Sequence, residues 1–178
     1  MRVDLIKYQK DLSQVSEIDF ARLAMAIDAE GSICIGKRDR ISRASERRDG
    51  SEKVFRSYTL YVSVCNTDPR LVNWCKERFG GSVRFLKPGP KRLNKKILLQ
   101  WIIASVMAED VLINCLPFFI IKKEKADLAL AFRRTFIRGS ALVGTGHVIR
   151  PEVLQEREEI RNNLLNLPDN VVEIKEVA

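Results

Sequence analysis

The sequence predicts an α+β fold with an antiparallel sheet, and three observations support this prediction. Apolar residues recur at helical spacing in several segments. Between these segments lie stretches that alternate apolar and polar residues and have high β-propensity, which is typical of strands. The resulting order is helix, strand, strand, helix, strand, strand, helix, and a helical C-terminal piece follows. We therefore expect an N-terminal extension at 1–15, a core at 16–137, and a C-terminal loop, helix and tail at 138–178.

The first helix is expected to begin after Ser16, which occupies the N-cap position. Asp19, three residues later, completes a variant of the capping box. The apolar residues of this helix recur at helical spacing and are Phe20, Leu23, Ala24 and Ile27. Gly31 is expected to end the helix in the left-handed conformation, and residues 32–35 to form the first strand.

The second strand is expected at 54–65 and has the clearest alternation in the chain. The core-facing residues would be Tyr58, Leu60, Val62 and Val64. The opposite side would carry Ser57, Thr59, Tyr61 and Ser63. This hydroxyl-rich side is either plain solvent exposure or a surface that reads nucleic-acid bases. The polar stretch at 37–56 is expected to contain a strand end, a long flexible loop and the start of the second strand.

A second helix is expected after the turn at 66–69, with Thr67 or Asp68 as its cap and Pro69 in its first turn. Gly80 and Gly81 would end this helix. The remaining expected elements are strands at 82–86 and 97–103 and helices at 105–116, 120–136 and 151–167.

The net charge of +8 and the pI of about 9.5 indicate a polyanion or an anionic surface as partner. The connection between the last two strands carries basic residues without an acid, which favours phosphate contact. These residues are Arg84, Lys87, Lys91, Arg92, Lys95 and Lys96. No signal peptide and no apolar run of about 20 residues is evident, so we expect an intracellular protein without a membrane partner. Four scattered cysteines and a single histidine argue against a zinc site and favour reduced thiols.

Glu30 lies in the last turn of the first predicted helix, where a carboxylate faces the negative end of the helix dipole. A hard cation, which prefers carboxylate and carbonyl oxygens together, would make this position favourable. The alternative is a solvated glutamate at a helix end. Asp28 lies about 200° around the same helix from Glu30. We therefore expect a capping role or a buried polar contact for Asp28 and no part in catalysis.

Residues 23–31, with the sequence LAMAIDAEG, closely resemble the LAGLIDADG motif that names a family of homing endonucleases. The identical positions are Leu23, Ala24, Ile27, Asp28, Ala29 and Gly31. Glu30 is a conservative match to the metal-binding acid, whereas Met25 replaces a residue that is usually small. The resemblance extends from about residue 16 to residue 137, and the sequence contains no second copy of the motif.

The resemblance implies an αββαββα core with a saddle-like antiparallel sheet. It also implies a homodimeric endonuclease, encoded within an intron or a similar mobile element, that makes a double-strand break in a long pseudo-palindromic DNA site. The cofactor would be Mg²⁺, with Mn²⁺ able to substitute and Ca²⁺ expected to bind without turnover. The alternatives on the same fold are an intron RNA maturase, which would add intron RNA as a partner, and a DNA-binding protein that does not cleave.

The resemblance also implies roles for individual residues. The catalytic residues would be Glu30, Lys122, Asn66 and Arg70, and the metal would be bound by Glu30 and the backbone carbonyl of Ala29. The residues expected to face DNA are Cys34, Gly36, Arg38, Arg40, Ser57, Thr59, Ser63, Arg84, Leu86 and Gln100. The residues expected at the dimer interface are Leu23, Ala26, Ile27 and Ala29. The plainer alternatives are a surface lysine at Lys122, a turn residue at Asn66 and a surface charge at Arg70.

Overall fold

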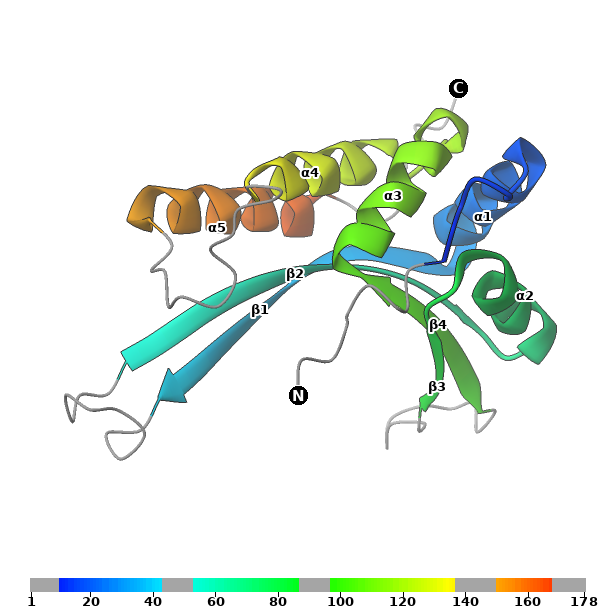
Figure 1. Cartoon of the computed structure of the whole chain (residues 1–178), viewed down its shortest axis with the longest axis horizontal. Coiled ribbons are helices and arrows are strands. Elements are labelled where there is room, and N and C mark those ends of the chain that lie inside the picture. The colour runs from blue at the N-terminus through cyan, green and yellow to red at the C-terminus, as the bar shows by residue number, and fades with distance from the viewer. Residues whose placement is uncertain (1–9, 43–52, 87–96, 137–149, 168–178) are drawn as a thin grey trace, which may run out of the picture.

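The computed structural model describes residues 10–42, 53–86, 97–136 and 150–167. The elements in chain order are α1 (Glu17–Glu30), β1 (Gly31–Ser42), β2 (Lys53–Asn66), α2 (Pro69–Phe79), β3 (Ser82–Leu86), β4 (Leu98–Ala104), α3 (Ser105–Cys115), the 3-10 helix η3 (Leu116–Phe118), α4 (Lys123–Arg134) and α5 (Pro151–Asn166). The strands form one antiparallel sheet in the order β1-β2-β4-β3, and the helices cover one face of it (Figure 1). The other face is curved and concave (Figure 1). The predicted α+β class is therefore confirmed.

The core lies between the convex face of the sheet and the helices. The four residues predicted to face it from β2 are all buried: Tyr58, Leu60, Val62 and Val64. Trp101 from β4 is fully buried, and its indole N–H donates to the Gly80 carbonyl over 2.8 Å. This hydrogen bond satisfies the polar atom that an indole brings into a core.

The end of α1 differs from the prediction. Ser16 is the N-cap, as expected, and its hydroxyl accepts from the Asp19 N–H over 3.2 Å. Gly31 is extended, with φ −96° and ψ 176°, so the predicted left-handed exit is wrong, and β1 begins at Gly31 itself. A Cβ at Gly31 would lie 2.5 Å from Ile27 Cα and 2.8 Å from the Ser63 carbonyl oxygen. Glycine is required here because α1 meets β2 too closely for a side chain.

The strands β1 and β2 are longer than predicted. They pair without interruption from Gly31 opposite Val64 to Ser42 opposite Lys53, so part of the expected flexible loop is strand. Asp39 and Arg56 face each other across this ribbon and form an ion pair of 2.9 Å. Cross-strand pairs of opposite charge stabilise a ribbon whose individual residues have modest β-propensity.

The second half of the chain follows the prediction closely. Asp68 caps α2, and β3 has the expected bounds. The predicted helix at 120–136 begins later, at Lys123, because residues 119–122 form a connection after η3. Helix α5 packs against α4 and β1. None of the helices in the described part of the chain has the length and hydrophobicity needed to cross a membrane. The predicted basic connection at 87–96, the loop at 137–149 with His147, and both chain ends lie outside the described residues.

Candidate active site and nucleic-acid interface

Glu30 and Asn66, which the sequence analysis assigned to one site, lie in direct contact. Glu30 is the last residue of α1 and is exposed, and Asn66 is the last residue of β2. The Asn66 Nδ2 donates to Glu30 Oε2 over 2.7 Å, and Asn66 Oδ1 accepts from the Asp68 N–H, also over 2.7 Å. The second bond fixes the orientation of the amide, so its NH₂ group points at the carboxylate. Asn66 therefore belongs to the turn and orients Glu30 at the same time.

Lys122 is not a surface lysine, because it is only 5% exposed. Its Nζ donates to the Ile27 carbonyl over 2.8 Å and to the Asp28 carbonyl over 2.6 Å. These carbonyls lie at the C-terminal end of α1, where a cation offsets the helix dipole and satisfies terminal acceptors. The cation also compensates for the unfavourable position of Glu30 at this helix end.

Asp28 has the buried polar contact that the sequence predicted. It is 3% exposed, and its carboxylate accepts three backbone N–H groups from the connection between η3 and α4. The donors are Ile120 at 2.8 Å, Ile121 at 3.2 Å and Lys122 at 2.9 Å. The Asp28 carboxylate of α1 thus accepts from the connection, and the Lys122 side chain of the connection donates to carbonyls of α1. These bonds hold the last turn of α1, which carries Glu30, in place.

The structure gives Arg70 a partner other than Glu30. Its Nη2 lies 2.6 Å from Asp68 Oδ2, at the start of α2. Hydrogen bonds from Arg70, first from its side chain and then from its backbone N–H, lower the pKa of Asp68 to about 2. Both residues lie at the surface beside Pro69 and Ile97. The predicted role of Arg70 in the Glu30 site stays a prediction.

The donor set at Glu30 fits a hard cation only in part. Its carboxylate is exposed, and Ala29, whose carbonyl was predicted as a second ligand, is exposed as well. Within the described ranges, no cluster of three or more histidine, cysteine or acidic residues could hold a metal ion. Because hard cations take six or more oxygen ligands, the remaining oxygens must come from outside this chain.

The residues predicted to face DNA share the concave face of the sheet. In β1 they alternate with the buried Ile33 and Ile35, and the register places Gly36 opposite Thr59 and Arg38 opposite Ser57. In β3 and β4, Arg84 lies opposite Gln100. Residues opposite each other in an antiparallel pair point to the same face. The strand pattern therefore assembles one polar surface free of helices (Figure 1).

One residue of this face, Phe55, was missed, and another, Gly36, acts in a different way than predicted. Phe55 lies opposite Arg40 and is half-exposed. It is two residues before Ser57 in β2, and because alternate residues of a strand share a face, this spacing could have identified it. Gly36 makes room for Tyr61, because a Cβ there would lie 2.8 Å from the tyrosine ring. Gly36 thus shapes the surface through its neighbour.

A side-chain network crosses the concave face near Asn66. Arg84 Nε donates to Gln100 Oε1 over 2.7 Å, and Gln100 Nε2 donates to Ser63 Oγ over 3.1 Å. Ser63 is only 5% exposed, so its predicted direct contact with DNA is corrected to a supporting role. The network fixes the Gln100 amide, and among the described residues no partner accepts from the Arg84 Nη groups, which are free there to donate to a ligand.

The predicted dimer interface needs a correction at Leu23 and Ile27. Both are 0% exposed and pack in the core of their own chain, so neither is a surface residue. The prediction was wrong because the apolar stripe that identifies α1 faces the sheet and α3 of the same chain. The outer face of α1 instead exposes Ile18, Met25 and Ala29, with Ala26 partly exposed beside them.

Comparison with known proteins identifies the fold. The sequence matches no protein-family model and no curated protein. The structure matches solved structures of homing endonucleases, so the chain has the fold of that class.

Three of the matched structures illustrate this likeness. The homing endonuclease I-CvuI with its target is 20% identical with a TM-score of 0.61, and the match covers 88% of this chain and 85% of that one. The archaeal intron-encoded homing endonuclease I-Vdi141I with DNA is 14% identical with a TM-score of 0.59, and 91% and 90% are covered. The meganuclease I-SmaMI with DNA is 14% identical with a TM-score of 0.52, and 82% of this chain but 44% of that chain is covered.

Proposed function

We propose that this protein is a homodimeric, metal-dependent endonuclease that makes a double-strand break in a long pseudo-palindromic DNA site and is encoded within an intron or similar mobile element. The observation that carries the proposal is the exposed Glu30 carboxylate, oriented by Asn66 where α1 meets the sheet. The solved structures with this fold include complexes with DNA, which supports duplex DNA as the partner.

The charge and shape of the concave face support DNA binding. A two-stranded antiparallel ribbon fits the major groove, where each base pair presents a distinct pattern of donors and acceptors. Here the ribbon carries Arg38, Arg40 and Ser57 outward, and the net charge of the chain is +8. If about eight phosphates are neutralised per dimer, the logarithm of the affinity falls with that of the salt concentration with a slope of roughly −7.

A single motif supports a dimer. One chain supplies one Glu30, whereas cutting two strands requires two acidic sites, which a twofold axis would provide. The chain corresponds to nearly all of I-CvuI but to less than half of I-SmaMI, so two copies approach the size of the larger protein. The exposed apolar residues of α1, Ile18 and Met25, together with Ile120 and Ile121 beside its end, offer a surface for the second copy.

The proposed chemistry is phosphodiester hydrolysis. Mg²⁺ held by Glu30 and the Ala29 carbonyl of both copies, together with phosphate oxygens, would supply an activated water and neutralise charge on the scissile phosphate. Asn66 keeps the carboxylate turned toward this position, and Lys122 keeps the last turn of α1 fixed. The Lys122 cation and the exposed Arg70 are proposed to stabilise negative charge there.

The test is the cleavage of a randomised palindromic duplex library with Mg²⁺. We expect the native protein to cut one family of sequences, and Glu30→Gln to bind that family in Ca²⁺ without cutting it. Glu17→Gln, which removes an exposed carboxylate at the opposite end of α1, is the matched control and should cut like the native protein. Enrichment of one duplex by all three proteins without cutting would identify a binding module. Tight binding of structured RNA with no duplex selection would favour the RNA maturase.

A further inference from the structure

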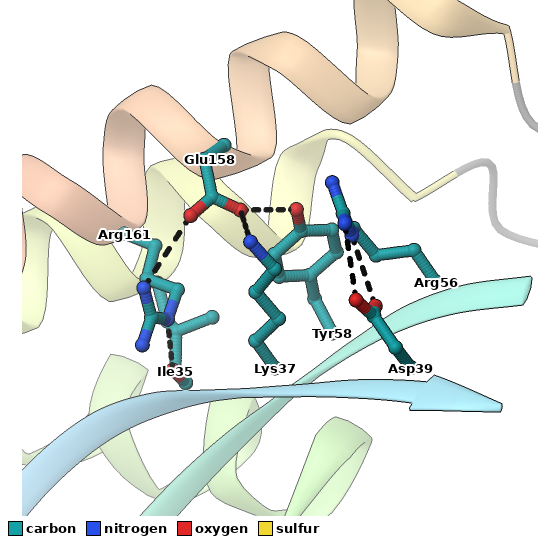
Figure 2. A network of polar contacts seen from close by, with 7 residues as sticks. All are labelled: Ile35, Lys37, Asp39, Arg56, Tyr58, Glu158 and Arg161. Atoms are coloured by element: carbon teal, nitrogen blue, oxygen red, sulfur yellow. Dashed lines mark hydrogen bonds and ion pairs between the residues drawn. The ribbon is translucent and has the colours of Figure 1, made fainter. Parts of the chain in front are cut away.

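Helix α5 contacts the β1-β2 ribbon through charged and hydroxyl groups (Figure 2). The Glu158 carboxylate accepts a hydrogen bond from the Tyr58 hydroxyl and forms an ion pair of 3.0 Å with Lys37 Nζ. Arg161 donates to the Ile35 carbonyl over 3.1 Å and lies 3.4 Å from Glu158. Because β1 is an edge strand, Arg161 also covers part of an edge that would otherwise be open.

The residue before Glu158, Arg157, attaches α5 to the segment that follows α4. Arg157 is buried, and its guanidinium stacks on the Phe136 ring at 3.8 Å. It donates to Thr135 Oγ1 over 2.8 Å and to the Thr135 carbonyl over 3.0 Å, just after α4. Two consecutive residues of α5 therefore connect the end of α4 to the ribbon.

The Glu158 carboxylate contacts the ribbon at a single cross-strand pair, Lys37 and Tyr58, which we call the rung. Lys37 and Tyr58 are direct cross-strand partners, so one carboxylate holds both strands at the same height. The neighbouring residues, Arg38 and Ser57, point to the concave face, because successive side chains alternate between faces. Beyond this rung, the ribbon continues to Ser42 and Lys53. A two-stranded ribbon alone is marginally stable, so its direction depends on where it is held.

The position of the rung determines which base pairs it affects. Arg38 and Arg40 lie seven and nine residues beyond Gly31, where the strand leaves the Glu30 site. At about 3.3 Å per residue this is roughly 23 to 30 Å. At about 3.4 Å per base pair the same length corresponds to roughly seven to nine base pairs.

We propose that Glu158 is a positioning residue that determines specificity at the outer base pairs of each DNA half-site, by holding the β1-β2 ribbon at the Lys37–Tyr58 rung. The inference rests on the proposed function, since it assumes that the concave face binds DNA. Recognition by outward residues of the ribbon requires that the ribbon be preorganised by a supporting shell. The Arg84–Gln100–Ser63 network has no contact with α5 among the described interactions, so recognition near the centre of the site should be independent of Glu158.

The first measurement is amide hydrogen exchange of the free protein, which needs no DNA. Glu158→Gln should raise exchange at 37–42 and 53–58 several-fold while β3 and β4 stay unchanged, because only the ribbon loses its support. Glu159→Gln, which alters the exposed neighbour on α5, is the matched control and should leave both regions unchanged. Unchanged exchange in Glu158→Gln would overturn the proposal.

The second measurement is binding in Ca²⁺ to the selected duplex, with each base pair of a half-site substituted in turn. Glu158→Gln should lose most of the discrimination at the outer positions, about tenfold per base pair where the native protein discriminates that strongly, and keep it at the inner ones. An equal loss at every position, or an unchanged profile, would overturn the proposal. If Glu158→Gln raises exchange at the ribbon but the native protein selects no duplex, Glu158 supports the ribbon without a role in specificity. That outcome would refute both the proposed function and the specificity role.

Discussion

Two parts of the molecule are held by different kinds of contact. The inner part is the Glu30 site, where α1 meets the sheet, and the outer part is the end of the β1-β2 ribbon farther from that site. At the inner part, the end of α1 is fixed by buried groups that bond to backbone atoms, as Asp28 and Lys122 do. At the outer part, the β1-β2 ribbon is held from behind by a partly exposed ion pair between Lys37 of β1 and Glu158 of α5. Buried contacts of this kind are little affected by salt, whereas partly exposed ion pairs are screened. The site proposed for catalysis is therefore the more rigid region, and the ribbon proposed for base recognition is the more adjustable one.

The largest effect should come from Asp28→Ala, at the inner part. The substitution leaves three backbone N–H groups without their acceptor in a buried site. We expect a loss of about 3 to 5 kcal/mol in the free energy of unfolding. Urea denaturation would measure it, with Asp127→Ala, on the exposed side of α4, as the control expected to change stability by about 0.5 kcal/mol or less. Equal losses for the two variants would contradict the importance of the buried contact.

Gly31→Ala should follow, and it tests the close contact between α1 and β2. The added Cβ would meet backbone atoms of Ile27 and Ser63 at 2.5 and 2.8 Å, so backbone must shift. We expect a loss of about 1 to 3 kcal/mol in the free energy of unfolding, measured by urea denaturation. Because the shift moves Glu30 relative to Asn66, cleavage should fall more than binding in Ca²⁺ does. A stable variant with native cleavage would show that the junction tolerates displacement.

The difference between the two regions also explains what the sequence could and could not predict. The strand pattern of β2 placed the polar residues on one face, because alternation is a local property. The position of Asn66 beside Glu30 followed from the family resemblance. The burial of Lys122 depends on carbonyls more than 90 residues earlier in the chain, and no local pattern contains that information.

The wrong assignment of Leu23 and Ile27 to the dimer interface and the missed contacts of α5 have a related cause. An apolar helical stripe, such as that of Leu23 and Ile27, looks the same whether it faces its own core or a partner. Arg157, Glu158 and Arg161 resemble any solvated charged helix in the sequence, and only the fold gives them partners. The strand β1 also extends past its predicted end, because backbone hydrogen bonds to β2 keep it extended there.

A change of pH should weaken the contact between α5 and the ribbon before it affects the inner part, and the effect should be smaller than that of the two substitutions above. Hydrogen bonds from Tyr58 and then Lys37 hold the pKa of Glu158 below its ordinary value of 4.5. The contribution of Glu158 to docking is therefore fully present above about pH 4.5 and is lost as the pH falls through its lowered pKa. Burial, and then the bond to Glu158, raises the pKa of Tyr58 to about 12, so the contribution of its hydroxyl is present below pH 10 and lost as the pH approaches 12.

Lys37, Arg56 and Arg161 are cations that face this pair. Nuclear magnetic resonance of backbone amides would follow the change, which we expect at 35–40 and 56–60 and in α5 before the rest of the sheet responds. Simultaneous loss of β3 and β4 signals would mean that the ribbon does not respond separately.

The smallest effect is expected for Asp39→Asn, beyond the rung that α5 holds. Asp39 and Arg56 form a well-aligned pair, yet both side chains are about two-fifths exposed. Water and salt screen such a pair, so the free energy of unfolding should change by about 0.5 kcal/mol or less. Thermal unfolding at low and high salt would measure it, and Glu158→Gln under the same conditions should give the larger change. If the two variants have equal effects, the ribbon is held by its own cross-strand pairs as much as by α5, and the division between a supported rung and a free outer segment does not exist.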